Sequence, residues 1–260
     1  MIHRHAGIAL NPSKKTMVHS RLSRRLRVLG QSDFATYLDA LERHGSEQPE
    51  WQEFVNALTT NLTSFFREAH HFPVLAQHLQ RRAAQAPLQI WCCAASTGEE
   101  PYSIAMTALD AFAPQAMPSV SILATDIDTG VLDRARRGVY PIDAVARLDP
   151  GLLRRHVLRG SGTSEGLVRM RPELCAMISF RQLNLLQPHW PLRRRFDAIF
   201  CRNVMIYFDR PTQARVLQRL ARHLKPDGLL FAGHSENFGR AGGPFEPRGM
   251  TVYGLAEVAR

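Results

Sequence analysis

The sequence predicts an α/β fold, in which a mostly parallel sheet carries a small antiparallel β insertion and follows a small all-α domain. Apolar runs typical of buried parallel strands alternate with helical segments from residue 88 onward. The first 60 residues contain amphipathic helical patterns instead. A glycine-rich turn between two short apolar segments indicates the insertion. We therefore expect a helical domain over residues 1–60 and a second domain over residues 61–260, with the insertion at about residues 140–177.

The composition is that of a globular protein with a real core, since 45% of the 260 residues are hydrophobic. No apolar run is long enough to span a membrane, and the N-terminus lacks a signal-peptide pattern, so a cytoplasmic location is expected. The four cysteines show neither metal-ligand nor disulfide spacing, and we expect no bound metal. The net charge of +10 favours anionic partners without choosing among them.

The N-terminal region is predicted to form three helices. Between Met17 and Leu29, apolar residues recur at spacings of three and four, and Gly30 suits the end of this helix. The same pattern recurs in residues 34–41 and 51–58. The first of these segments is also strongly basic. It leaves two interpretations open, a solvated helix face or a surface for an acidic partner.

The first half of the second domain is typical of a nucleotide-type cofactor site. A strand over Leu88–Cys93 runs into a turn at Gly98, and a helix follows from about Tyr102. The next strand, residues 120–125, ends at Asp126, where an acidic residue can accept hydrogen bonds from ribose hydroxyls. The turn has one glycine where dinucleotide sites carry three, which speaks against a bound pyrophosphate.

The remaining elements follow from the same patterns. A helix is expected over Thr129–Arg137, a hairpin over residues 157–170 and a strand over Ile178–Leu183. The apolar run from Phe196 stops on Cys-Arg-Asn, at the end of a strand where open α/β sheets bind ligands. Residues 224–233 are expected to hold a helix end, a turn and a buried strand. Residues 250–255 are expected to form an antiparallel strand at the sheet edge.

Five segments together resemble the chemotaxis receptor methyltransferases of the CheR family: Asn61–Glu68, Ala95–Ser103, Asp126–Asp128, Cys201–Phe208 and Gly233–Asn237. The resemblance covers nearly the whole chain. It implies a Rossmann-like methyltransferase sheet and S-adenosylmethionine as cofactor, with S-adenosylhomocysteine as product. The implied reaction is methyl transfer to glutamate side chains on the cytoplasmic helices of chemoreceptors, which serves chemotactic adaptation.

The resemblance also implies a set of cofactor contacts: Asn61, Thr63, Arg67, Glu100, Asp126, Asn184, Leu185, Arg202 and Asn203. Their chemistry fits, because Glu100 can meet the cofactor ammonium, Asp126 the ribose, and Asn184 with the backbone of Leu185 the adenine edge. Taken singly, these side chains could instead cap or favour helix ends.

Arg67 and Tyr207 are the catalytic candidates, as residues that orient the acceptor carboxylate or the sulfonium end. A solvated glutamate has a pKa of about 4.3, so the acceptor is already a nucleophile at neutral pH. No general base is needed, and we interpret His234 as structural.

The expected partner is the cytoplasmic domain of a chemoreceptor, bound by a protein that we expect to be a monomer. Arg21, Arg24 and Arg25 are assigned to its acidic methylation region, while Gly160 and Gly162, in the turn of the insertion, are assigned to its C-terminal tail peptide. Two rivals are a nucleic-acid methyltransferase and a non-catalytic receptor-binding module. The first lacks support because no Asp/Asn-Pro-Pro-Tyr/Phe segment follows Cys201. The second is disfavoured by the intact set of polar cofactor residues.

Overall fold

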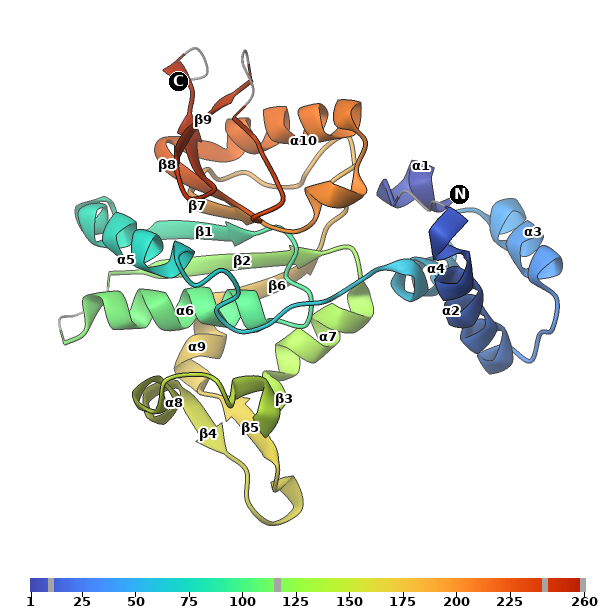
Figure 1. Ribbon diagram of the computed structural model, residues 1–260, viewed down its shortest axis with the longest axis horizontal. Helices are drawn as coiled ribbons and strands as arrows, with labels where there is room; N and C mark the ends of the chain where they lie inside the picture. The colour runs from blue at the N-terminus through green and yellow to red at the C-terminus, as the bar shows by residue number, and fades with distance from the viewer. Residues whose placement is uncertain (9–11, 115–117, 240–242, 258–260) are drawn as a thin grey trace.

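The computed structural model describes residues 1–8, 12–114, 118–239 and 243–257. It has three parts: an N-terminal helical domain, a domain built on a seven-stranded sheet, and a small β subdomain below that sheet in the view of Figure 1. The N-terminal helices are α1 (Ile2–Ala6), the short 3₁₀ turn η1 (Pro12–Lys14), α2 (Lys15–Val28), α3 (Phe34–His44) and α4 (Pro49–Leu58).

The three predicted N-terminal helices are confirmed as α2, α3 and α4, and their local signals are in place. Gly30, with φ at 66°, follows the end of α2, and the side chain of Asp33 accepts from the backbone N–H of Thr36 at the start of α3. Their apolar stripes meet in a core that includes Tyr37 and Phe54. At the edge of this core, the carboxylate of Glu50 accepts hydrogen bonds from Arg25 and Tyr37.

The large sheet has the strand order β6-β2-β1-β7-β8-β10-β9. The first five strands in this order are parallel to one another. β10 pairs antiparallel with β8, and β9 pairs antiparallel with β10. The strands are β1 (Leu88–Cys92), β2 (Val120–Asp126), β6 (Ile178–Gln182), β7 (Phe196–Cys201), β8 (Leu224–Ala232), β9 (Phe245–Gly249) and β10 (Val252–Leu255).

Helices cover both faces of this sheet (Figure 1). One hydrophobic cluster lies between the strands and α5 (His71–Arg81) and α6 (Glu99–Phe112), and a second lies under α10 (Arg210–His223). Helix α7 (Thr129–Arg137) has the predicted bounds, and α6 begins three residues before the predicted Tyr102. Two further 3₁₀ turns, η2 (Ala83–Gln85) and η5 (Met205–Tyr207), lie in loops.

Two expectations for the C-terminal part were wrong. No separate turn precedes the strand after α10, because extended backbone starts at Leu224 and the irregularity is a register shift opposite β7, between Phe196 and Ala198. The final strand is antiparallel, as expected, but it does not form the edge. β9 pairs with its outer side and takes the edge position, and its mixed polarity concealed it in the sequence.

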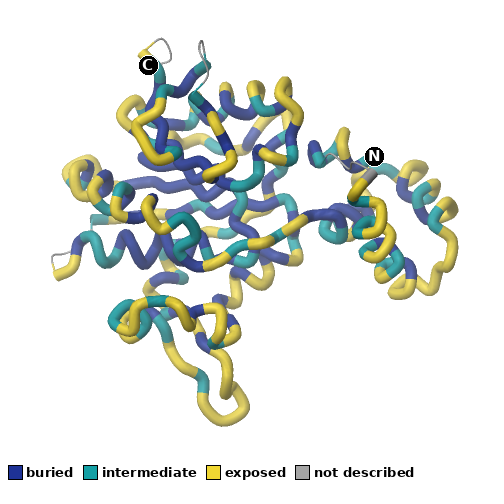
Figure 2. The backbone as a smooth tube through the Cα atoms, viewed as in Figure 1, coloured by how far each residue is buried: buried dark blue, intermediate teal, exposed yellow. Residues whose placement is uncertain are grey.

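The insertion is an antiparallel sheet with the order β3-β5-β4, formed by β3 (Val139–Pro141), β4 (Val157–Arg159) and β5 (Leu167–Met170). Tyr140 and Met170 pack into the main core, while Leu158 and Leu167 remain exposed on the other face. Its remaining elements are η3 (Ile142–Val145), α8 (Pro150–His156), η4 (Gly162–Ser164) and α9 (Pro172–Met177). Figure 2 shows that the turn between β4 and β5 is almost entirely exposed.

The helical domain is fastened to the sheet domain by polar contacts of α4. Asn56 donates to the hydroxyl of Thr129 at the start of α7 over 3.0 Å, and Gln52 donates to the carbonyl of Ile127 over 2.9 Å. Both contacts involve the loop that follows β2, so the two domains meet beside the carboxyl ends of the parallel strands. Within the described ranges, no helix has the length and apolar character needed to cross a bilayer.

Candidate active site

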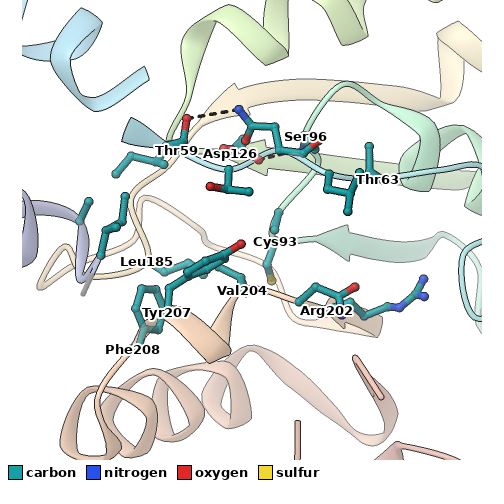
Figure 3. Close-up of a pocket in the computed structure, with 18 of the residues that line it drawn as sticks. Thr59, Thr63, Cys93, Ser96, Asp126, Leu185, Arg202, Val204, Tyr207 and Phe208 are labelled. Atoms are coloured by element: carbon teal, nitrogen blue, oxygen red, sulfur yellow. Dashed lines mark hydrogen bonds between the residues drawn. The ribbon is translucent and has the colours of Figure 1, made fainter. Parts of the chain in front are cut away.

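A cavity of about 1020 Å³, including the space at its open mouth, lies where the helical domain meets the carboxyl ends of the parallel strands. All nine sequence-predicted cofactor residues line it, and so does Tyr207. Figure 3 shows Tyr207 projecting into this space, with Asp126 and Arg202 on other sides of it. The helical domain contributes lining residues that sequence reasoning missed: Ala6, Ile8, Lys14, Met17 and Leu58.

Asp126 ends β2 with its carboxylate at the cavity wall. Its Oδ2 accepts from the backbone N–H of Ser96 over 2.8 Å, and its Oδ1 accepts from that of Asp128 over 3.0 Å. Burial outweighs these hydrogen bonds and raises the pKa of Asp126 to about 6. Each carboxylate oxygen retains acceptor capacity, which suits the two neighbouring hydroxyls of a ribose.

The loop after β2 also holds the segment that connects the two domains. Asp128 is 2% exposed, and its Oδ2 accepts from the hydroxyl of Thr59 over 2.5 Å and from the amide of Asn61 over 2.8 Å. Its Oδ1 caps α7 through the N–H of Val131. The backbone carbonyl of Asn61 in turn accepts from the hydroxyl of Ser96. Asn61 therefore lines the cavity while its side chain anchors the connecting segment.

Arg202 and Glu100 form a buried ion pair at another wall, with 2.7 Å between Nη1 and Oε2. A second guanidinium nitrogen of Arg202 donates to the backbone carbonyl of Arg67. Burial raises the pKa of Glu100, and the charge of Arg202 opposes that rise. Arg202 is only 3% exposed, so its guanidinium interacts with buried Glu100 and is shielded from anions in solution. Arg67 itself is partly exposed and donates to the carbonyl of Leu62.

Behind Arg202 lies Glu68, which joins the segment before α5 to the loop after β8. Its Oε1 accepts from the backbone and ring nitrogens of His234, and its Oε2 is 3.4 Å from Arg202. Burial would raise the pKa of Glu68, but the His234 hydrogen bonds and Arg202 lower it to about 2. Glu68, His70 and His71 also present ligand atoms within 4.8 Å of one another. Arg202 lies beside this group, and the two hydrogen bonds from His234 link Glu68 to the loop after β8.

The segment after β7 is held by Glu236. This buried carboxylate accepts from the backbone N–H groups of Asn203, Met205 and Gly233. Asn203 itself has a φ of 57°, an uncommon conformation that these hydrogen bonds help to maintain. They fix the path of the chain into the η5 turn, which presents Tyr207 to the cavity.

The adenine candidate Asn184 is tied to the N-terminal helix. Its amide donates to the carbonyl of His5 over 2.6 Å, and its Oδ1 accepts from the N–H of Leu186. Gly7, just after α1, has no room for a side chain, because a Cβ there would lie 2.6 Å from the ring of Phe208. Helix α1 thus closes the side of the cavity that holds Asn184 and Leu185.

The structure separates the residues assigned to partners. None of them lines the cavity. Arg21 donates to the backbone carbonyls of Ala57 and Thr59, and Arg25 pairs with Glu50, whereas Arg24 is exposed. In the β4–β5 turn, the backbone itself requires the two glycines. A Cβ at Gly160 would lie 2.1 Å from the carbonyl oxygen of Ser164, and Gly162 has a φ of 57°.

Comparison with known proteins identifies what this architecture is similar to. The family model described as "CheR methyltransferase, all-alpha domain" matches residues 1–59, and "CheR methyltransferase, SAM binding domain" matches residues 61–253. The chemotaxis protein methyltransferase of Klebsiella aerogenes is 54% identical over 257 residues, covering 99% of this chain and 87% of that protein. The protein of the same name from Salmonella typhimurium is 52% identical, covering 99% and 88%. Chemotaxis protein methyltransferase 2 of Pseudomonas aeruginosa is 54% identical, covering 98% and 90%.

Proposed function

The chain belongs to the CheR family of chemotaxis methyltransferases, with its S-adenosylmethionine-binding domain, and on that basis we propose that it methylates glutamate side chains of chemoreceptor cytoplasmic helices. The product would be a glutamate methyl ester, which removes one negative charge from the receptor. S-adenosylmethionine supplies an activated methyl group on a sulfonium centre. The acceptor oxygen would form a bond to the methyl carbon as the carbon–sulfur bond breaks, and S-adenosylhomocysteine would be the leaving group.

One observation supports a carboxylate acceptor above others: the lining residues best suited to act as a general base are either absent or engaged elsewhere in the proposed arrangement. Among the described lining residues there is no histidine. Of the two lining carboxylates, Glu100 is paired with Arg202, and Asp126 accepts two backbone hydrogen bonds and is assigned to the ribose. An amine or alcohol acceptor would have to lose a proton during the reaction. A glutamate carboxylate, with its pKa of about 4.3 in water, needs no such help.

The lining residues suit the parts of the cofactor. Asp126 can accept from the ribose hydroxyls, and Glu100 can meet the ammonium of the methionine end, its own charge balanced by Arg202. The small residues Ala94 and Ser96 leave room for the cofactor beside the turn after β1. Asn184 keeps one N–H and one lone pair for the adenine edge.

Rate enhancement would then come from alignment and partial desolvation of two opposite charges. Tyr207 is fixed by the Glu236-anchored segment and projects into the cavity (Figure 3). Arg67 is fixed through its backbone carbonyl by Arg202. In this proposal both residues orient reacting groups without taking part in proton transfer.

The test of this proposal is the fate of the methyl group. The purified protein is incubated with methyl-labelled S-adenosylmethionine and receptor-bearing membranes, and the label is then measured as volatile methanol after mild base treatment. A base-labile label in the receptor band supports the proposal. Label in nucleic acid, base-stable label in protein, or no transfer at all would each contradict it.

We also propose two contacts with the receptor. The exposed side chain of Arg24 would face the acidic methylation region, where its effect should weaken as salt is added. The strands β3 and β4 are the two edges of the small sheet, and an extended tail peptide could pair with one of them. The exposed apolar residues Leu158 and Leu167 would give such a peptide its side-chain contacts.

A further inference from the structure

The charged residues of the cavity do not balance one another. Those that line it in the described parts of the chain are Lys14, Arg67, Glu100, Asp126 and Arg202. Glu100 pairs with Arg202, which also lies 3.4 Å from Glu68, and Asp126 accepts two backbone hydrogen bonds. The charge of Arg67 acts on Glu100 without a direct ion pair, and Lys14 forms no ion pair with a described residue. The transfer reaction brings two carboxylates into the cavity, the α-carboxylate of the cofactor and the side chain of the acceptor.

The two cations stand in different places. Arg67 belongs to the wall of the methionine end, because its carbonyl accepts from Arg202, which pairs with Glu100. Lys14 comes from the other domain, at the end of the η1 turn. Its Nζ lies over the ring of Tyr207, 5.5 Å from the centroid, and it forms no ion pair with any residue that the structure describes.

We propose that Lys14 binds the carboxylate of the acceptor glutamate and holds it beside Tyr207, while Arg67 serves the cofactor end. The inference rests on the proposed function and adds the residue that recognises the acceptor. An ammonium on a flexible four-carbon stem can follow an incoming side chain to the methyl group. The contact with Tyr207 holds the cation at the reacting centre when no acceptor is present.

The chemistry predicts how Lys14 affects the kinetics. The acceptor carries a full negative charge when it binds, and that charge is lost progressively as the new carbon–oxygen bond forms. Lys14 therefore attracts the bound substrate more strongly than the transition state. Removing such an interaction raises KM and leaves kcat unchanged or somewhat higher, but never lower. A residue with a purely structural role would change stability and would not produce this split.

The experiment compares Lys14→Gln with Lys15→Gln, using the full-length protein and receptor-bearing membranes. Lys15 is the next residue, is exposed, and does not line the cavity, so its replacement removes the same charge as a matched control. Lys14→Gln should raise KM for the receptor by roughly tenfold, equivalent to about 1.4 kcal/mol, with kcat within about twofold of wild type. Lys15→Gln should change KM by less than about twofold. Lys14→Arg, which keeps the positive charge, should have a receptor KM close to that of the wild type.

Calorimetric titration with S-adenosylhomocysteine separates the two carboxylates. Lys14→Gln should keep wild-type affinity for this product. A loss of that affinity with an unchanged receptor KM would assign Lys14 to the cofactor and overturn the inference. A receptor KM equal to wild type, or raised as much by Lys15→Gln, would also overturn it. A wild-type protein that methylates no receptor would instead refute the proposed function, and this inference would fall with it.

Discussion

The amide of Asn61 donates to the Oδ2 of Asp128 over 2.8 Å, and this hydrogen bond ties the segment between the domains to the loop that follows β2. The hydroxyl of Thr59 donates to the same oxygen. Thr59, Asn61 and Asp126 all line the cavity, while Asp128 lies behind them and touches no cofactor atom in the proposed arrangement. Asp128 therefore acts as a positioning residue, which fixes one wall of the cavity and caps α7 at the same time.

Replacing Asp128 with alanine should lower both stability and cofactor affinity. The change removes a helix cap, worth about 1 kcal/mol. It also takes a charged acceptor from the buried hydroxyl of Thr59 and the half-buried amide of Asn61. We expect the free energy of unfolding to fall by roughly 3 kcal/mol and the affinity for S-adenosylhomocysteine to fall about tenfold. Denaturant titration and calorimetry measure the two effects.

Asp149→Ala is the matched control, because Asp149 caps α8 through the N–H of Leu152 and lies in the insertion, away from the cavity. It should cost about 1 kcal/mol and leave the affinity for S-adenosylhomocysteine unchanged. Equal loss of affinity in both variants would mean that general destabilisation, rather than the position of Asn61, weakens binding.

The raised pKa of Asp126 predicts a pH dependence of cofactor binding. In the free protein its carboxyl titrates near pH 6. Ribose hydroxyls donate to the carboxylate and stabilise the ionised form, so the pKa is lower in the complex than in the free protein. Binding therefore takes place with proton release below about pH 6. The dissociation constant of S-adenosylhomocysteine should be flat from pH 7 to 8 and rise below pH 6, by at most tenfold per pH unit.

Asp126→Asn tests the assignment of this pH dependence, because asparagine does not titrate. The variant should bind more weakly than wild type at pH 7 and show a flat profile down to pH 5. If the variant kept the wild-type pH dependence, a different group would be responsible for it. Glu100, whose pKa is also raised by burial, would then be the first alternative.

The cofactor side of the cavity could be predicted from the sequence because parallel strands place their carboxyl ends at one edge. Asp126 and Arg202 were identified as residues that follow buried strands, and both line the cavity. Lys14 could not be found in this way. It lies in a separate domain, and only the docking of α4 on the loop after β2 brings it to Tyr207. No local pattern encodes such a contact.

The same limit explains the assignment of the basic helix. In the sequence, Arg21, Arg24 and Arg25 are equivalent members of one charge run. The fold makes them different: Arg21 donates to the carbonyls at the end of α4 and Arg25 donates to Glu50, while Arg24 is exposed. The edge strand β9 could not be predicted for a related reason. Its residues show no apolar pattern typical of a strand, and its extended backbone is recognised only from the pairing with β10.

Tyr207→Phe should separate turnover from binding. The change removes the hydroxyl and keeps the ring that contacts Lys14 and packs beside the second core cluster. We expect kcat to fall roughly tenfold or more through loss of alignment, with affinity for S-adenosylhomocysteine within about twofold. Tyr253→Phe deletes the same atom from a buried tyrosine of β10 outside the cavity and should leave kcat unchanged. Wild-type turnover in Tyr207→Phe would return Tyr207 to a structural role.

The basic face of α2 provides the last prediction, which compares Arg24→Ala with Arg25→Ala. Arg24 is exposed, so its loss should spare stability and raise KM for the receptor a few-fold, an effect that shrinks as salt is added. The guanidinium of Arg25 donates to both carboxylate oxygens of Glu50, which also accepts from Tyr37. Its loss should lower the free energy of unfolding by roughly 1–2 kcal/mol, because Glu50 keeps a partly buried charge with one partner fewer. Denaturant titration and initial rates at low and high salt measure these effects. If Arg24→Ala has wild-type KM at low salt, this face of α2 is a solvated surface and the receptor contacts lie elsewhere.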